Sequence, residues 1–169
     1  MRPEVLARIR AVKRAGRVLR TGAWRAADAI DHVVLDADER FRRRIVLIGE
    51  HGTKLLLDMA EVTALHDGDG LVLDDDTVVA VVAKPEPLIE IAAQDAAALA
   101  RFAWHLGNRH TELQVADDKL RMRRDHVLEE MLAGLGASLT PIEAPFEPER
   151  GAYDHGHEGG REDERGSRG

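Results

Sequence analysis

Residues 84–87 have the sequence Lys84-Pro85-Glu86-Pro87, and the spacing of apolar residues differs on the two sides of this stretch. Two prolines two residues apart cannot sit inside a sheet ladder, so we expect a linker or a sharp strand boundary here. Before it, short apolar runs are typical of strands, and after it apolar residues also recur at helical spacing. We therefore expect a β-rich domain at residues 1–83, a second domain at 84–149 and a tail at 150–169.

The first part of the chain is a series of short apolar runs separated by turn-forming residues. The runs are residues 32–35, 45–48, 55–57, 71–73 and 78–82. Glycine and acidic residues, which tolerate tight turns, fill the segments between them. Many short strands at this spacing, with no long helix, predict a small β-sandwich or barrel-like domain.

The second part contains two helix signals among further strands. Asp95 can cap a helix that Gly107 ends, and Asp125 can cap a second helix that Gly136 stops. Strands are expected at residues 113–115, 120–122 and 138–142. With a strand before the first helix, the order is strand, helix, strand, strand, helix, strand, which is the ferredoxin-like βαββαβ arrangement. The predicted fold class is therefore α+β.

The tail from Arg150 onward is almost entirely glycine and charged residues, with two histidines. Such a segment cannot bury enough apolar surface to offset the entropy of ordering it, so we expect it to be disordered. It contains His155-Gly156-His157, and two imidazoles one residue apart can chelate a borderline divalent ion. From the residues alone, incidental histidines in a polar tail are an equal alternative.

Composition excludes several classes of protein. The chain has no cysteine, which rules out disulfides, zinc–thiolate sites and iron–sulfur clusters and is compatible with a reducing cytoplasm. Any bound metal must then be held by imidazole, carboxylate or backbone oxygen. A net charge of −7 argues against nucleic-acid binding. Since no apolar run has transmembrane or signal-peptide character, we expect a soluble cytoplasmic protein without membrane contact.

Residues 1–25 carry eight arginine or lysine residues against the single acid Glu4. A solvated first strand is the favoured interpretation. A transit peptide, or a docking patch for an acidic partner, is the alternative.

His110 is the first candidate metal ligand. It falls just beyond the predicted helix end, on a turn next to Gly107, where an imidazole can project toward a partner or a symmetry-related chain. A solvated surface histidine is the alternative at this point. His105 lies beside the apolar stripe of the helix and is expected to pack there. His126 follows a helix cap and can form a looser second site, or stay a surface histidine.

The remaining motifs carry little chemistry. His32, His51 and His66 lie in strand or turn contexts without ligand spacing, and we assign them no role. No nucleophile elbow, P-loop, HExxH or GxGxxG motif occurs. The acidic residues at 67–76 do not follow the EF-hand ligand order. We therefore expect a metal carrier and not an enzyme.

Three blocks occur in order in the second part of the chain: Trp104-His105-Leu106-Gly107-Asn108-Arg109-His110, Asp125-His126-Val127-Leu128-Glu129-Glu130-Met131, and Ala144-Pro145-Phe146-Glu147-Pro148-Glu149 with Gly151-Ala152-Tyr153. Together they resemble the urease accessory protein family UreE, the nickel metallochaperones of urease maturation. The resemblance is concentrated in residues 95–157. It implies an N-terminal β-domain for partner recognition and a ferredoxin-like domain that forms a homodimer.

The resemblance also implies roles for individual residues. His110 of both subunits would share one Ni(II) ion at the dimer interface, and His155 and His157 would close over it from the tail. Some family members carry a histidine two residues before the position of His126. Here that residue is Arg124, which should weaken or abolish a metal site at His126. Zn(II) or Cu(II) can bind the same ligands.

The resulting hypothesis is a homodimeric chaperone that passes Ni(II) to the urease accessory GTPase and the urease apoprotein activation complex. Since neutral imidazole is the ligand, binding should weaken as the pH falls through about 6.5. A general divalent-metal buffer or sensor without a dedicated client is the main alternative. A small hydrolase or transferase with His110 as base, and a purely structural adaptor, are the others.

Overall fold

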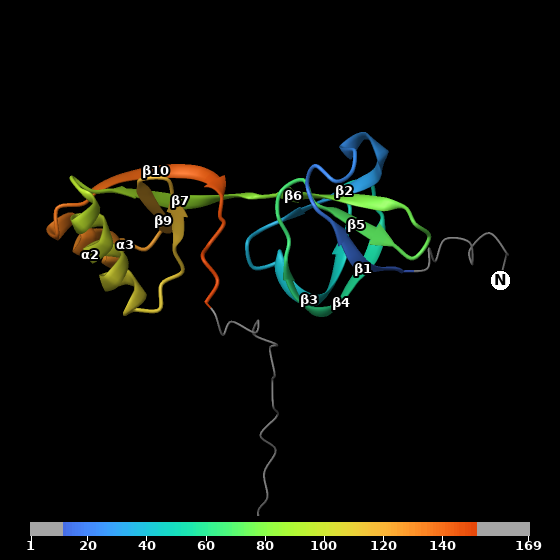
Figure 1. The fold of residues 1–169 in the computed structure, drawn as a ribbon, viewed down its shortest axis with the longest axis horizontal. Helices are drawn as coiled ribbons and strands as arrows, with labels where there is room; N and C mark the ends of the chain where they lie inside the picture. Colours follow the sequence, from blue (N-terminus) through green and yellow to red (C-terminus); the bar gives the residue numbers. More distant parts are fainter. Residues whose placement is uncertain (1–11, 152–169) are drawn as a thin grey trace, which may run out of the picture.

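The computed structural model describes residues 12–151, which form two sheets arranged end to end along the long axis of the molecule (Figure 1). The tail at 152–169, with the predicted ligands His155 and His157, lies outside the described residues, as do residues 1–11. Within residues 12–151, no helix combines the length and the apolar character needed to cross a membrane.

The first sheet has six strands in the order β2-β6-β5-β1-β4-β3 and is strongly curled (Figure 1). The strands are β1 (Lys13–Leu19), β2 (Ala29–Leu35), β3 (Phe41–Ile48), β4 (Lys54–Ala64), β5 (Gly70–Leu73) and β6 (Val78–Ala83), with one 3-10 turn, η1 (Ala26–Asp28). Every apolar run identified in this part of the sequence lies in one of these strands. The predicted barrel-like β-domain is confirmed as a curled half-barrel.

Aliphatic side chains fill the inside of this curled sheet. On β2, residues 31, 33 and 35 are buried, so alternate side chains point inward. The core contains leucine, valine and alanine and no aromatic residue: Ala15, Val33, Leu35, Leu47, Leu55, Leu57, Leu65, Leu71, Leu73, Val79 and Val81. One member of the inward-facing set on β2 is a carboxylate, Asp31, whose role is described below.

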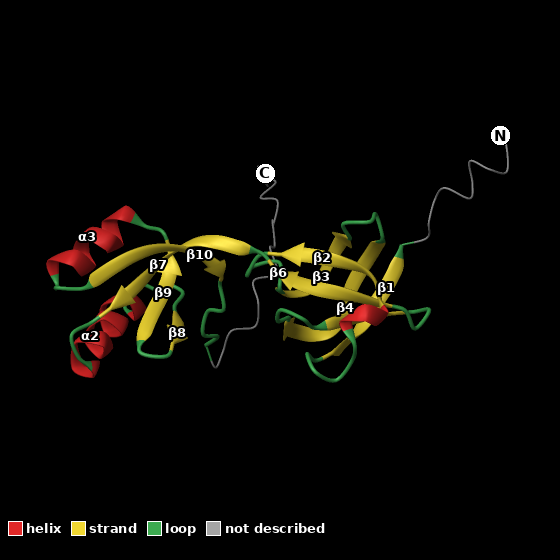
Figure 2. Cartoon of the chain, turned by 90° about the horizontal axis from the view of Figure 1, so that it is seen from above, coloured by secondary structure: helices red, strands yellow, loops and turns green. Residues whose placement is uncertain are grey.

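The second sheet is antiparallel, with the order β10-β7-β9-β8. Its elements are β7 (Pro85–Ala92), α2 (Ala96–Gly107), β8 (Gln114–Ala116), β9 (Lys119–Arg123), α3 (His126–Gly134) and β10 (Ser138–Pro145). Both helices lie beside this sheet, at the end of the molecule away from the first sheet (Figure 2). Phe102, Leu106 and Leu132 of the helices pack against its strands. Element order and strand order confirm the ferredoxin-like arrangement.

The predicted caps begin both helices. The Asp95 carboxylate accepts a hydrogen bond from the Ala98 backbone N–H at 2.7 Å, and Asp125 caps the first turn of α3 in the same way. At the other end of α3, Gly136 has φ 91° and lies two residues after the last helical residue. Its N–H donates to the Ala133 carbonyl, and the Ala137 N–H donates to the Leu132 carbonyl. These two bonds are the Schellman motif.

The expectation for residues 84–87 is wrong in one respect, because Pro85 and Pro87 lie inside β7. Both prolines pair with β10, while β9 pairs with β7 only from Leu88 onward. Ile89 lies opposite Pro141, which has no N–H, so these two residues cannot form a hydrogen-bonded pair. Pair types alternate along an antiparallel ladder, so Pro85 and Pro87, which are four and two residues before Ile89, are also in non-hydrogen-bonded pairs with β10. The nitrogens of Pro85 and Pro87 therefore face the edge that β9 leaves open, where no donor is needed.

The buried side chain of Arg40 joins the two sheets. It follows β2 in the connection to β3, and only 3% of the residue is exposed. Its guanidinium donates to the carbonyl of Leu65, at the end of β4, and to the carbonyl of Phe146, just after β10. It also forms an ion pair with Glu147 at 2.8 Å. One side chain thus binds backbone from both halves of the molecule.

We expect Arg40→Ala to lower the free energy of unfolding by about 2–4 kcal/mol, because it leaves buried carbonyls and a carboxylate without their donor. Urea unfolding followed by circular dichroism measures this change. Arg25→Ala is the matched control, since Arg25 is exposed and forms only a local ion pair with Asp28. Equal effects of the two substitutions would show that Arg40 does not hold the sheets together.

Candidate metal centre

His110 lies at the C-terminal end of α2 in an unusual backbone conformation. Its φ is 55°, in the left-handed region that glycine normally occupies. The His110 N–H donates to the Gly107 carbonyl at 3.0 Å, and the Thr111 N–H donates to the Leu106 carbonyl at 3.1 Å. These bonds form a second Schellman motif, with histidine in place of the usual glycine. A side chain in this conformation costs roughly 1–2 kcal/mol.

An open hollow lies beside this helix end. It is lined by Arg109, His110, Thr111, Glu112, Arg123, Arg124, Asp125, Val127 and Leu128. The hollow therefore brings the end of α2 next to the start of α3, and with them two of the sequence blocks described above. His110 is exposed, and Val127 is 60% exposed despite its apolar side chain. The hollow thus presents an exposed imidazole beside an exposed aliphatic side chain.

Arg123 connects one wall of the hollow to the junction of the sheets. It donates to Glu86 on β7, to Glu112 in the hollow and to Asp38 in the connection between β2 and β3, at 2.7–3.2 Å. Burial lowers the pKa of Arg123, but the hydrogen bond to Glu86 and the charge of Asp38 outweigh burial, so that its pKa is raised. The guanidinium stays charged and fixes this wall.

His126 is the first residue of α3 and is exposed. Two residues earlier, Arg124 forms two hydrogen bonds with the Glu129 carboxylate, at 2.7 and 2.9 Å. These bonds lower the pKa of Glu129 and raise that of Arg124. Arg124 therefore contributes to the start of the helix and offers no lone pair to a metal. Neither His126 nor His110 joins a group of three possible ligands among residues 12–151.

His105 is half-buried on α2, and its ring meets that of the exposed Trp104 edge to face, with centroids 5.0 Å apart.

A different group of possible ligands gathers in the first sheet. Asp31, His32 and His51 each offer one ligand atom, and these atoms lie within 4.8 Å of one another. Neither histidine was expected to have a role, because both lie in strand or turn contexts without ligand spacing. His51 lies in a turn 20 positions from Asp31. Only the neighbouring Asp31-His32 pair and a glycine-flanked His51 are visible in the sequence, and neither has the spacing of a known metal motif.

The carboxylate of Asp31 organises this group. Its Oδ1 accepts hydrogen bonds from the N–H groups of His32 and His51, and its Oδ2 accepts one from Thr53, at 2.8–3.0 Å. Burial raises the pKa of Asp31, but hydrogen bonds from His51, Thr53 and His32 outweigh burial and hold that pKa well below its ordinary value. Asp31 is therefore ionised at neutral pH, and it fixes the turn at residues 49–53 against β2.

Comparison with known families covers nearly the whole chain. The model of the UreE urease accessory protein N-terminal domain matches residues 7–84, and that of the UreE C-terminal domain matches residues 86–168. The chain belongs to the UreE family of urease accessory proteins.

Individual relatives agree. The urease accessory protein UreE of Bradyrhizobium sp. strain BTAi1 is 54% identical over 140 residues, which are 83% of this chain and 68% of the relative. UreE of Rhodopseudomonas palustris strain HaA2 is 54% identical over 131 residues, 78% of this chain and 61% of the relative. UreE of Chelativorans sp. strain BNC1 is 47% identical over 132 residues, 78% of this chain and 84% of the relative. The chain thus spans only about two thirds of the first two.

The unusual backbone at His110 gives a test that does not depend on metal. We expect His110→Gly to be more stable than His110→Ala by about 1 kcal/mol, because glycine adopts a positive φ without steric cost. Thermal and urea unfolding of the metal-free proteins measure the difference. Gly136→Ala is the reciprocal control and should destabilise by a similar amount, since a Cβ there would meet nothing within 4 Å and only its φ of 91° opposes it. Equal stability of the two His110 variants would contradict the assigned strain.

Proposed function

We propose that this member of the UreE family is a nickel metallochaperone of urease maturation, in which His110 of two chains binds one Ni(II) at a homodimer interface. The observation that carries the proposal is the exposed imidazole held in a left-handed conformation, where glycine would be favoured on stability alone. A residue that persists at a conformational cost is commonly retained for function. Membership of the UreE family of urease accessory proteins supports urease maturation as the process that this function serves.

The proposed site suits a carrier. Two imidazoles, one from each chain, leave several coordination positions of the ion open. The ion is then held at neutral pH yet stays accessible to the ligands of the next protein. His155 and His157 of the tail are proposed as auxiliary ligands that close over it. Zn(II) and Cu(II) share the preference for imidazole and are expected to compete. A metal site at His126 would be weak, because Arg124 is engaged by Glu129.

The two sheets are proposed to form two domains with separate tasks, bounded near residue 84. The second would dimerise and bind metal. The first would dock onto the accessory GTPase and the urease apoprotein complex in the cytoplasm. In support, Val46 and Ile48 of β3 are each 63% exposed, which gives the first sheet an apolar surface outside its core.

Nickel titration tests the metal assignment. We expect wild type to bind one tight Ni(II) per dimer by isothermal titration calorimetry, and both His110→Ala and His110→Gly to lose this step. Replacing His155 and His157 by alanine should weaken it by a smaller factor. Urease activation at limiting nickel should fall in the same order. Unchanged nickel binding by His110→Ala would make the central assignment wrong, whereas full urease activation by that variant would favour a structural adaptor.

A charge substitution tests the shared interface. We expect Val127→Glu to shift the mass measured by light scattering from dimer to monomer, because two carboxylates would be buried near the two-fold axis. The tight nickel step should disappear with the dimer. Val46→Glu is the matched control: Val46 is as exposed, 63% against 60%, but lies on the first sheet, so dimer and nickel step should both remain. A dimeric Val127→Glu with intact nickel binding would place the interface elsewhere.

A further inference from the structure

The group at Asp31, His32 and His51 is not part of the proposed His110 site, since it belongs to the first sheet. His32 lies on β2, and His51 lies in the turn between β3 and β4. The Glu50 N–H donates to the His32 carbonyl at 2.9 Å, so the turn is attached directly to β2. The two imidazoles are thus brought together by backbone pairing and not by a flexible approach.

Asp31 is positioned to orient a ring and not to bind an ion itself. Its carboxylate is fully buried and already accepts three backbone hydrogen bonds in addition to its contact with the His51 ring. Gly49 covers it so closely that a Cβ there would lie 2.3 Å from Oδ2. Little acceptor capacity and no space are left on either oxygen.

The contact with Asp31 selects the tautomer of His51. Nδ1 of His51 lies 3.1 Å from Asp31 Oδ1, and an ionised carboxylate can only accept a hydrogen bond. Nδ1 therefore carries the proton, and Nε2 keeps its lone pair. Metal-binding histidines commonly have this arrangement, with one ring nitrogen donating to a carboxylate and the other on the metal. The His51 side chain is 72% exposed, so solvent reaches this ring.

The second imidazole lies close by. The His32 and His51 rings meet edge to face, with centroids 5.4 Å apart and an interplanar angle of 77°. Bonds of about 2.0–2.1 Å from one ion to two imidazole nitrogens require those nitrogens to lie within about 4 Å. One nitrogen of each ring lies within 4.8 Å of the other, so binding one ion through both rings requires them to close by up to about 1 Å.

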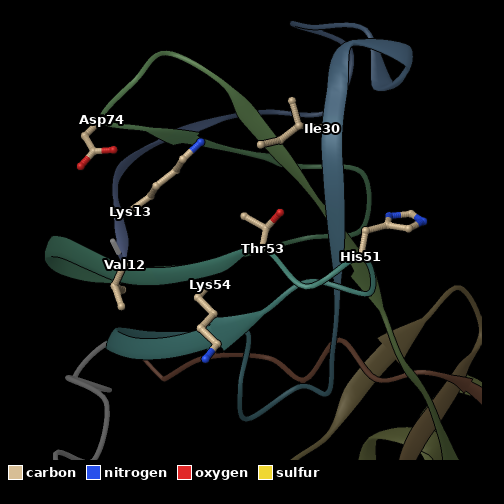
Figure 3. A pocket seen from close by; sticks show the side chains of 7 residues that line it. All are labelled: Val12, Lys13, Ile30, His51, Thr53, Lys54 and Asp74. Atoms are coloured by element: carbon tan, nitrogen blue, oxygen red, sulfur yellow. The ribbon is translucent and has the colours of Figure 1, made fainter. Parts of the chain in front are cut away.

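Figure 3 shows the surroundings. His51 lines a pocket together with Val12, Lys13, Ile30, Thr53, Lys54 and Asp74, and its ring is turned away from the other labelled side chains. The imidazole is thus presented outward at the rim, while the backbone N–H groups of residues 51 and 53 point to Asp31. An anchor for the turn needs only the backbone donors, so the pairing of the two rings is not required to hold the turn in place.

We propose that His32 and His51 form a second metal site, which binds a borderline divalent cation such as Zn(II) or Ni(II) through two imidazoles, with Asp31 orienting His51. The site has few protein ligands and is open to solvent, so it binds more weakly than a closed structural site. It does not depend on His110, on dimerisation or on the tail.

The test removes the other candidate ligands first. The full-length background variant carries alanine at residues 110, 126, 155 and 157, and its Zn(II) binding is measured by competition with a chromophoric chelator. We expect one Zn(II) per chain to remain. Adding His51→Ala or His32→Ala should weaken this binding at least about tenfold. Adding His66→Ala is the matched control, because His66 is an exposed histidine of the same half of the chain, and binding should not change.

Two results would overturn the site: no residual Zn(II) binding by the background variant, or equal binding after His51→Ala and His66→Ala. Either leaves the His110 assignment untouched, because that residue is absent from the background. A measurement on wild type avoids any dependence on variant folding. With ¹⁵N-histidine labelling, Zn(II) should shift the Nε2 signal of His51 and leave Nδ1 protonated. A shift showing Nδ1 as the ligand would remove the orienting role of Asp31.

Discussion

The buried guanidinium of Arg40 is the contact on which the arrangement of the two sheets depends. It binds carbonyls that follow β4 and β10, and a carboxylate next to the second of these. The covalent connection between the sheets is also short, since only Lys84 separates β6 from β7. The Lys84 N–H donates to the Leu35 carbonyl at the end of β2. The ion pair of Arg123 with Asp38 and the hydrogen bond from the Ala37 N–H to Glu86 cross the same junction, so the sheets cannot turn freely about each other. A protein docked on the first sheet, as proposed above, would therefore be held in a fixed relation to the end of α2.

Both candidate metal sites contain a local feature that opposes folding. His110 has a left-handed backbone where glycine is favoured, and Asp31 is an ionised carboxylate buried beneath the turn at residues 49–53. Each persists because its surroundings determine it: a Schellman pair of hydrogen bonds in the first case, three backbone donors in the second. Such features cluster at functional sites. They differ in kind, because the strain at His110 would vanish with glycine, whereas Asp31 also fixes the turn at residues 49–53.

Local signals in the sequence predicted the helices and strands, but they could not predict features that depend on how the strands pair. Asp95 and Asp125 cap helices through bonds to residues two or three positions away, so short patterns predict them. The element order then limits the sheet to the split βαβ arrangement. The prolines of β7 were misjudged because their nitrogens face an edge that is open only in the final pairing. The pairing of His32 with His51 through Asp31 likewise follows from the three-dimensional course of the chain.

The scarcity of ligands is what fits this chain to carrying an ion. Without cysteine it can offer a borderline metal only imidazoles and oxygens, and the proposed sites supply two imidazoles each. Four protein ligands close a structural zinc site, so that the ion contributes to folding and is not released. Two ligands leave positions for water, which an incoming carrier can replace one bond at a time. In the proposed function, incomplete coordination on a rigidly joined pair of sheets would combine a defined place for the ion with a low barrier to its departure.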